Sequence, residues 1–141
     1  MGYKIGWDNP EKTVVLQQYV DPASKDDLYR LAKESANLLN SVSHTVHLII
    51  DERNINMVLT MPDMNYLERL TPENQGFVIL VETESKLKYK EVVQVIGKKV
   101  APTAFSANKT FFSASIEEAR LFLQEHCDVH YPSNGAVSTD R

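Results

Sequence analysis

The sequence has one cysteine, Cys127, among its 141 residues, and this number excludes a disulfide within the chain. A single thiol is typical of proteins that work in a reducing compartment. The first residues, MGYKIGWDN, lack the basic segment followed by an apolar segment that marks a secretory signal. We therefore expect a cytoplasmic protein whose stability depends on its core and not on covalent cross-links.

Long hydrophobic runs and an excess of positive charge are also missing. The apolar stretches are short pieces such as FVILV at residues 77–81, whereas a membrane-spanning helix needs about 20 such residues. The 15 Lys and Arg residues and the 19 Asp and Glu residues give a net charge of -4. Proteins that bind nucleic acids usually carry a basic surface. We expect neither membrane insertion nor a nucleic-acid partner.

The sequence also lacks the motifs of the common enzyme classes. Glycine is scarce, with five residues, and no GxGxxG or Walker-type lysine motif offers a cradle for phosphate. The motifs GxSxG, HExxH and CxxC do not occur. His126 and His130 have the spacing of two metal ligands on one helix, but no third ligand is identifiable. We predict a protein that is not an enzyme and that carries neither a metal nor a cofactor.

The sequence does contain a regular alternation of strand-like and helix-like segments. With 43% hydrophobic and 24% charged residues, the chain has the composition of one globular domain. Strands that alternate with helices of about ten or more residues imply right-handed crossovers and a mostly parallel sheet. We expect a single domain over residues 1–126 and a flexible tail over residues 127–141.

The predicted fold class is α/β, with a mixed, mostly parallel five-stranded sheet, about four helices and the order β-β-α-β-α-β-α-β-α. The first strand enters through a short turn and is expected to be the antiparallel one. The five strands are predicted near residues 4–7, 13–20, 46–50, 76–82 and 110–115. The four helices are predicted near residues 25–42, 62–70, 89–100 and 116–126.

Acidic residues stand at the ends of several predicted strands, namely Asp21, Asp51 and Glu82. In open α/β sheets, ligand sites form beyond the carboxyl ends of the parallel strands. Oxygen ligands at such a rim would suit a hard cation such as Mg²⁺. The other interpretation of Asp51 is structural, with its carboxylate capping the next turn or pairing with Arg53. We prefer this structural interpretation.

Four segments of the chain resemble the STAS-like superfamily, and most of all its small bacterial SpoIIAA-like or STAS/SEC14-like members. These segments are KIGW near the start, ANLLNSV at the end of the first helix, VHLIID in the central strand, and FSASIEEARLFLQEH at the end. The resemblance covers almost the whole predicted domain. It implies a mixed sheet backed by helices and a regulatory role in binding other proteins.

The segment NMVLTMPDM, at residues 56–64, stands where the phosphoswitch members of that superfamily carry an Asp-Ser-Ser-Gly-like sequence. It has neither the Asp-Ser pair nor the glycine, and Thr60 is its only hydroxyl. We therefore expect the serine phosphoswitch to be absent and interpret Thr60 as the cap of the second helix. The SEC14-like side of the resemblance implies a different use, an apolar cavity that holds a lipid or another hydrophobic ligand.

Three of the four methionines lie within this segment, and methionine suits core, partner surfaces and ligand pockets alike. Our first hypothesis is a non-enzymatic protein-binding module that uses the loop 54–61 and the helix 62–70.

The alternative is a carrier of an apolar small molecule or lipid, with its cavity under the same segment. An exposed sheet edge and an apolar second helix also favour a homodimer. The predicted binding surface consists of Asn54, Met57, Thr60, Met61, Met64 and Tyr66.

Overall fold

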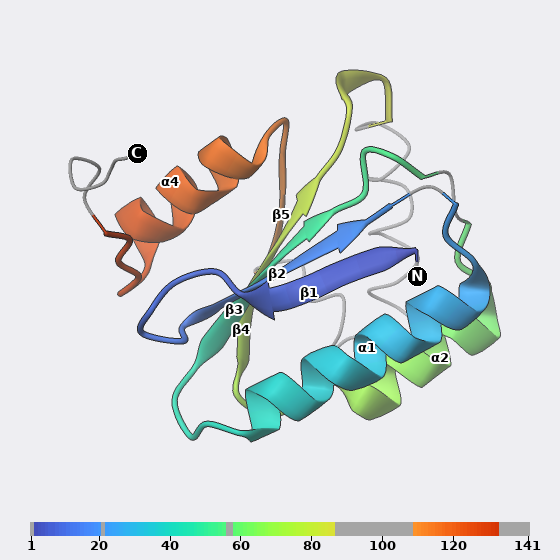
Figure 1. Cartoon of the computed structure of the whole chain (residues 1–141), viewed down its shortest axis with the longest axis horizontal. Helices are drawn as coiled ribbons and strands as arrows, with labels where there is room; N and C mark the ends of the chain where they lie inside the picture. Colours follow the sequence, from blue (N-terminus) through green and yellow to red (C-terminus); the bar gives the residue numbers. More distant parts are fainter. Residues whose placement is uncertain (1, 21, 56–57, 87–108, 133–141) are drawn as a thin grey trace.

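The computed structural model describes residues 2–20, 22–55, 58–86 and 109–132 of the chain. In these parts it is an α/β structure in which one sheet has helices on both faces (Figure 1). The strands are β1 (Tyr3–Trp7), β2 (Val14–Tyr19), β3 (Val46–Asp51), β4 (Gln75–Val81) and β5 (Thr110–Ser113). The helices are α1 (Lys25–Asn40), α2 (Met61–Leu70) and α4 (Ile116–His126).

The sheet has five strands in the order β1-β2-β3-β4-β5. β1 is antiparallel to β2, and every other neighbouring pair is parallel. The prediction of an α/β fold with a mixed, mostly parallel five-stranded sheet is therefore confirmed. The helix predicted near residues 89–100 lies outside the described residues. Within the described ranges, no helix has both the length and the apolar composition that a bilayer crossing requires.

The helices divide unequally between the two faces of the sheet. α1 and α2 lie side by side on one face, and α4 covers the other (Figure 1). This arrangement follows from right-handed crossovers, because strands that follow one another across the sheet place their connecting helices on the same face.

The strand register shows which side chains share a face, because successive residues of a strand point to opposite sides. The face covered by α1 and α2 contains two rows across the parallel strands. These are Val15, Leu48, Val78 and Thr110 in one row, and Gln17, Ile50 and Leu80 in the other.

The face covered by α4 is closely packed. Ala119 and Leu123 of α4 are completely buried against it. The rings of Phe111 and Phe122 have centroids 4.7 Å apart, and those of Phe77 and Phe111 are 5.0 Å apart. Contacting aromatic rings of this kind fill volume efficiently, so this half of the core is well filled.

α1 and α2 each begin with a side-chain cap, close to the helix starts predicted from the sequence. Ser24 and Asp27 form a reciprocal capping box at the start of α1. Thr60 and Asp63 form a second one at the start of α2: the Thr60 hydroxyl accepts from the Asp63 N–H at 3.3 Å, and Asp63 Oδ2 accepts from the Thr60 N–H at 2.9 Å. The prediction that Thr60 caps the second helix is therefore confirmed.

The packed part of the chain continues beyond α4. Val129 is only 2% exposed and belongs to the core on the α4 face. The Tyr131 hydroxyl donates to Asp8 Oδ2 at 2.6 Å and so joins this segment to the loop after β1. The segment predicted as a tail, residues 127–141, therefore begins with residues that pack on the domain. Its remainder, residues 133–141, lies outside the described residues.

Candidate functional site

Asp51, at the end of β3, is engaged by its neighbour Arg53. The Arg53 guanidinium donates to both carboxylate oxygens of Asp51 at 2.9 Å, and the Arg53 N–H donates at 3.1 Å. Burial of Asp51 opposes ionisation, but the hydrogen bonds and charge of Arg53 outweigh it and lower the pKa of the carboxyl group. Asp51 is thus an ionised, structurally paired carboxylate, as the preferred interpretation has it.

The acidic residues at the strand ends do not form one cluster. Asp51 pairs in register with Val81, so Glu82 projects from the opposite face of the sheet. Glu82 is fully buried, and Asp21 lies outside the described residues. In the described part of the chain, no group of three or more His, Cys, Asp or Glu side chains is placed to hold a metal ion.

The predicted binding surface at the start of α2 separates into residues with different surroundings. Met64 is 4% exposed and belongs to the core, so its assignment to a surface is corrected. Its burial follows from its place on the inner side of α2, one turn after the cap. Met61 is 55% exposed, and Asn54 and Thr60 are exposed as well. Met57 lies outside the described residues.

Tyr66, the last residue predicted for that surface, packs between the two helices. Its ring lies 4.6 Å from that of Tyr29 on α1, measured between centroids. Arg69 lies 5.8 Å from the centre of the same ring. Tyr66 is therefore only partly exposed, and part of its surface is already used in contacts within the chain.

Asp63 joins α2 to α1, a role that the sequence pattern did not reveal. Its side chain is almost completely buried, accepts from the Tyr29 hydroxyl at 2.5 Å and forms an ion pair with Lys25. Burial raises the pKa of this carboxyl group, but hydrogen bonds from Lys25, Tyr29 and Thr60 outweigh burial and lower it strongly. This charged link holds the first turn of α2 against the first turns of α1.

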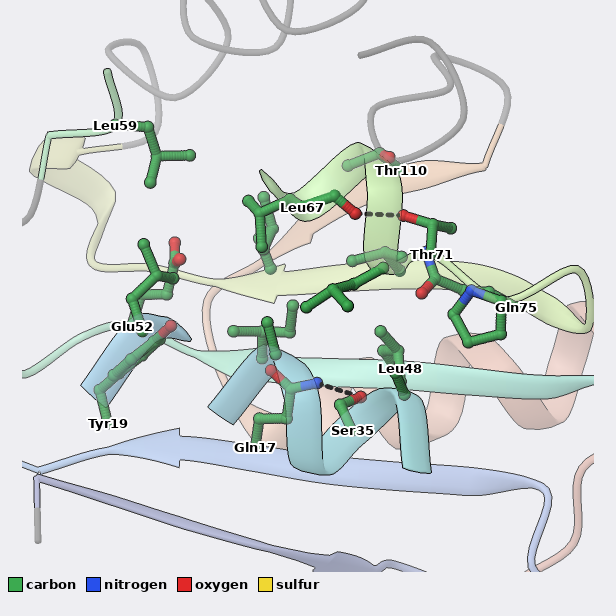
Figure 2. A pocket seen from close by; sticks show the side chains of 18 residues that line it. Gln17, Tyr19, Ser35, Leu48, Glu52, Leu59, Leu67, Thr71, Gln75 and Thr110 are labelled. Carbon is green, nitrogen blue, oxygen red and sulfur yellow. Dashed lines mark hydrogen bonds between the residues drawn. The ribbon is translucent and has the colours of Figure 1, made fainter. Parts of the chain in front are cut away.

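Beneath the helix pair lies a cavity of about 140 Å³, which we call the hollow (Figure 2). Its floor is the face of the sheet that bears Gln17, Ile50 and Leu80, and its walls come from α1, α2 and the segments that flank α2. The described residues that line it are Gln17, Tyr19, Leu28, Ala32, Ser35, Ala36, Leu48, Ile50, Glu52, Leu59, Leu67, Leu70, Thr71, Pro72, Gln75, Val78, Leu80 and Thr110.

The hollow exists where α1 turns small side chains toward the sheet. Ala32, Ser35 and Ala36 occupy that side of the helix, between the larger Leu28 and Leu39. Short side chains at the contact cannot fill the space above the sheet when α2 is held beside α1. Met61 and Met64 are not among the lining residues, so the part of α2 that faces the hollow is leucine and not methionine.

Two of the polar groups in the hollow bond to each other. Gln17 Nε2 donates to Ser35 Oγ at 2.8 Å, which joins β2 to α1 (Figure 2). The Thr71 hydroxyl donates to the backbone oxygen of Leu67 at 2.8 Å. Thr110 differs: its hydroxyl oxygen is buried and has no hydrogen-bond partner among the described residues.

The sequence carried a partial signal for this site. Gln17 interrupts a strand of apolar residues, VVLQQY, at a position whose side chain points inward. An inward amide requires a partner, and Ser35 on the following helix supplies it. Nothing local in the sequence marks Thr110, because threonine is ordinary in a strand. Its isolation depends on which residues the fold places around it.

Comparison with known proteins gives no information on function, so a function must be argued from the geometry of the candidate sites. No protein-family model, curated protein or solved structure matches the chain. The resemblance to the STAS-like superfamily therefore stays a prediction that rests on the sequence segments quoted above. The hollow and the exposed side chains at the start of α2 remain as the features from which a function can be argued.

Proposed function

We propose that this protein is a binding module that holds a small, largely apolar molecule in the hollow. The observation that carries the proposal is a cavity of about 140 Å³ lined mainly by Leu, Ile, Val and Ala side chains. This is the carrier function expected as an alternative from the sequence, with the site placed beneath α1 and α2.

The energetics of packing favour an occupant. Protein interiors are close-packed, and an unfilled cavity costs about 24 cal/mol per Å³. A guest that fills the space restores the lost contacts. An apolar cavity of about 150 Å³ in another protein binds benzene, so a guest with about six to eight non-hydrogen atoms fits this one.

A titration with toluene tests the proposal, with Ala36→Leu as the blocking variant. Ala36 is buried and lines the hollow, so the added leucine atoms occupy the space of the guest. Ala114→Leu is the matched control, because Ala114 is exposed in the turn between β5 and α4. We expect calorimetry to show binding by the wild type and by Ala114→Leu, and a loss of at least about tenfold in affinity for Ala36→Leu. Equal binding by Ala36→Leu, or no binding by the wild type, would contradict the proposal.

Exposed apolar side chains beside α2 favour a second function, the binding of another protein. Val58 is 63% exposed and Met61 is 55% exposed, and they lie three positions apart in the chain. Large apolar side chains that gather on a surface are a feature of interaction sites. This candidate is the protein-binding and regulatory role that the STAS-like resemblance implies, without a serine phosphoswitch.

Met61→Glu tests this second candidate, with Leu121→Glu as its control. Leu121 on α4 has the same exposed fraction as Met61, 55%. If α2 is the interface, Met61→Glu abolishes recovery of a partner in an affinity pull-down, whereas Leu121→Glu leaves it unchanged. Light scattering on the same variants detects a second copy of the chain as the partner. Unchanged recovery and an unchanged mass for a folded Met61→Glu protein would rule out this surface.

A further inference from the structure

Thr110 stands out among the residues that line the hollow. It is the first residue of β5 and pairs in register with Val78, so its side chain lies on the same face of the sheet as the floor of the hollow. The residue is 8% exposed, and its Oγ1 atom has no hydrogen-bond partner among the described residues. Buried hydroxyl groups almost always have a partner. A guest in the hollow would supply one.

Three other polar side chains of the hollow, those of Gln17, Ser35 and Thr71, already take part in hydrogen bonds within the chain. Gln17 donates to Ser35 at 2.8 Å on the β2 side of the hollow. The Thr71 hydroxyl donates to the Leu67 carbonyl oxygen at 2.8 Å. β2 and β5 are three strands apart, which corresponds to roughly 14 Å. Thr110 is the residue of β5 that lines the hollow, and its hydroxyl oxygen is available to a guest at that end.

The charges around the hollow are unsuited to an anionic guest. Among the described residues that line it there is no Lys, Arg or His, and Glu52 and Tyr19 are the ionisable side chains. Burial raises the pKa of the Tyr19 hydroxyl, and the negative charge of Glu52 raises it further. The same two effects disfavour any other anion in this space. A carboxylate, such as the head of a fatty acid, would lose its hydration without gaining a cation.

We infer that the guest carries no negative charge and has one hydroxyl, carbonyl or amide group that bonds to Thr110 Oγ1. The inference rests on the proposed function and adds the chemical class of the ligand. The apolar body of the guest, about the size of one six-membered ring, lies between the sheet residues Val78 and Leu80 and the α2 residue Leu67. The hydroxyl of Thr110 thus selects compounds with such a polar group over hydrocarbons of the same shape.

Phenol and toluene, which have the same number of non-hydrogen atoms, test this inference against wild type and Thr110→Val. Valine keeps the shape of threonine and its preference for strands, so the variant is expected to fold. Calorimetry gives the ratio of phenol affinity to toluene affinity for each protein. We expect this ratio to be roughly 2- to 10-fold larger in the wild type, which is the value of one hydrogen bond. The difference in hydration between phenol and toluene is the same for both proteins, so it cancels when the two affinity ratios are compared.

Two further measurements complete the test. Thr110→Ser keeps the hydroxyl, and its affinity ratio should match that of the wild type. Cyclopentanecarboxylate should bind the wild type at least about tenfold more weakly than cyclopentanecarboxamide, which has the same number of non-hydrogen atoms, because the carboxylate loses its hydration without gaining a cation. Equal ratios in wild type and Thr110→Val, or equal binding of the carboxylate and the carboxamide, would overturn the inference and leave the proposed function standing. Failure of both phenol and toluene to bind the wild type would instead overturn the proposed function itself.

Discussion

The imidazole of His47 takes the place of a backbone acceptor in the ladder between β3 and β4. The register shifts between Val46 and Leu48, and the Phe77 N–H donates to His47 Nδ1 at 2.9 Å. Gly76 makes this contact possible, since a Cβ atom on it would lie 2.6 Å from His47 Nδ1. A histidine that the sequence left without a role is therefore a structural part of the central sheet.

His47 must be neutral at Nδ1 to accept this hydrogen bond, and burial together with the charge of Lys109 lowers its pKa below 6.5. Between that lowered pKa and about 6.5, the unfolded chain binds more protons than the folded one, so stability decreases as pH falls. We predict that the free energy of unfolding of the wild type decreases between about pH 7 and pH 5 more steeply than that of His47→Gln. Denaturant titrations at several pH values measure these slopes.

His44→Gln serves as the control for this prediction, because His44 is exposed and lies three residues earlier in the chain. It should keep the wild-type slope. A His47→Gln protein that is folded and has the same pH slope as the wild type would show that His47 is not the group responsible.

At the scale of elements, the position of α2 beside α1 depends on Asp63. The same carboxylate completes the helix cap with Thr60 and bonds to Lys25 and Tyr29 across the helix pair. The capping role is visible in the sequence TMPD, since a hydroxyl residue followed three positions later by an acid is a known start signal. The link to α1 is not visible there, because it depends on contacts between residues that are 34 and 38 positions apart in the chain.

Asp63→Asn keeps the shape of the side chain and removes its charge. We expect it to lower the free energy of unfolding by about 2 kcal/mol, because buried hydrogen bonds to a charged group are lost or weakened. Asp26→Asn, an exposed acid in the first turn of α1, should change stability by less than about 0.5 kcal/mol. Chemical denaturation of the three proteins at neutral pH gives both values.

The low pKa of Asp63 adds a pH dependence to the same comparison. A carboxyl group whose pKa is lowered on folding stabilises the protein above its unfolded pKa, near 4, and this contribution is lost as pH falls further. Acidification below about pH 4 should therefore reduce the gap between wild type and Asp63→Asn. A gap that is unchanged at low pH would mean that the charge of Asp63 does not contribute.

At the scale of the whole molecule, the two faces of the sheet are packed differently. The α4 face is filled by aromatic and aliphatic side chains, whereas the α1 and α2 face leaves the hollow open. The general rule for α/β proteins directs attention to the carboxyl ends of the strands, where Asp51 proved to be paired with Arg53. The candidate site lies instead on the sheet face, under the helix pair.

Fold and site were predictable to different degrees for a physical reason. Alternating and helical hydrophobic patterns are local, so VHLIID and the helix starts could be read from the sequence. A cavity is defined by what several elements fail to fill. The small residues Ala32, Ser35 and Ala36 belong to a normal helical stripe, and only their position opposite Ile50 and Leu80 makes them walls of the hollow.

The most direct test of the central claim is to locate a bound probe by NMR on methyl-labelled protein saturated with benzene. We predict intermolecular NOEs from benzene to the methyl groups of Leu67 and Leu80, which line the hollow. None should reach Val129, which is buried on the α4 face. NOEs confined to the Val129 side, or no NOEs at saturating benzene, would contradict the assignment of the hollow as a ligand site.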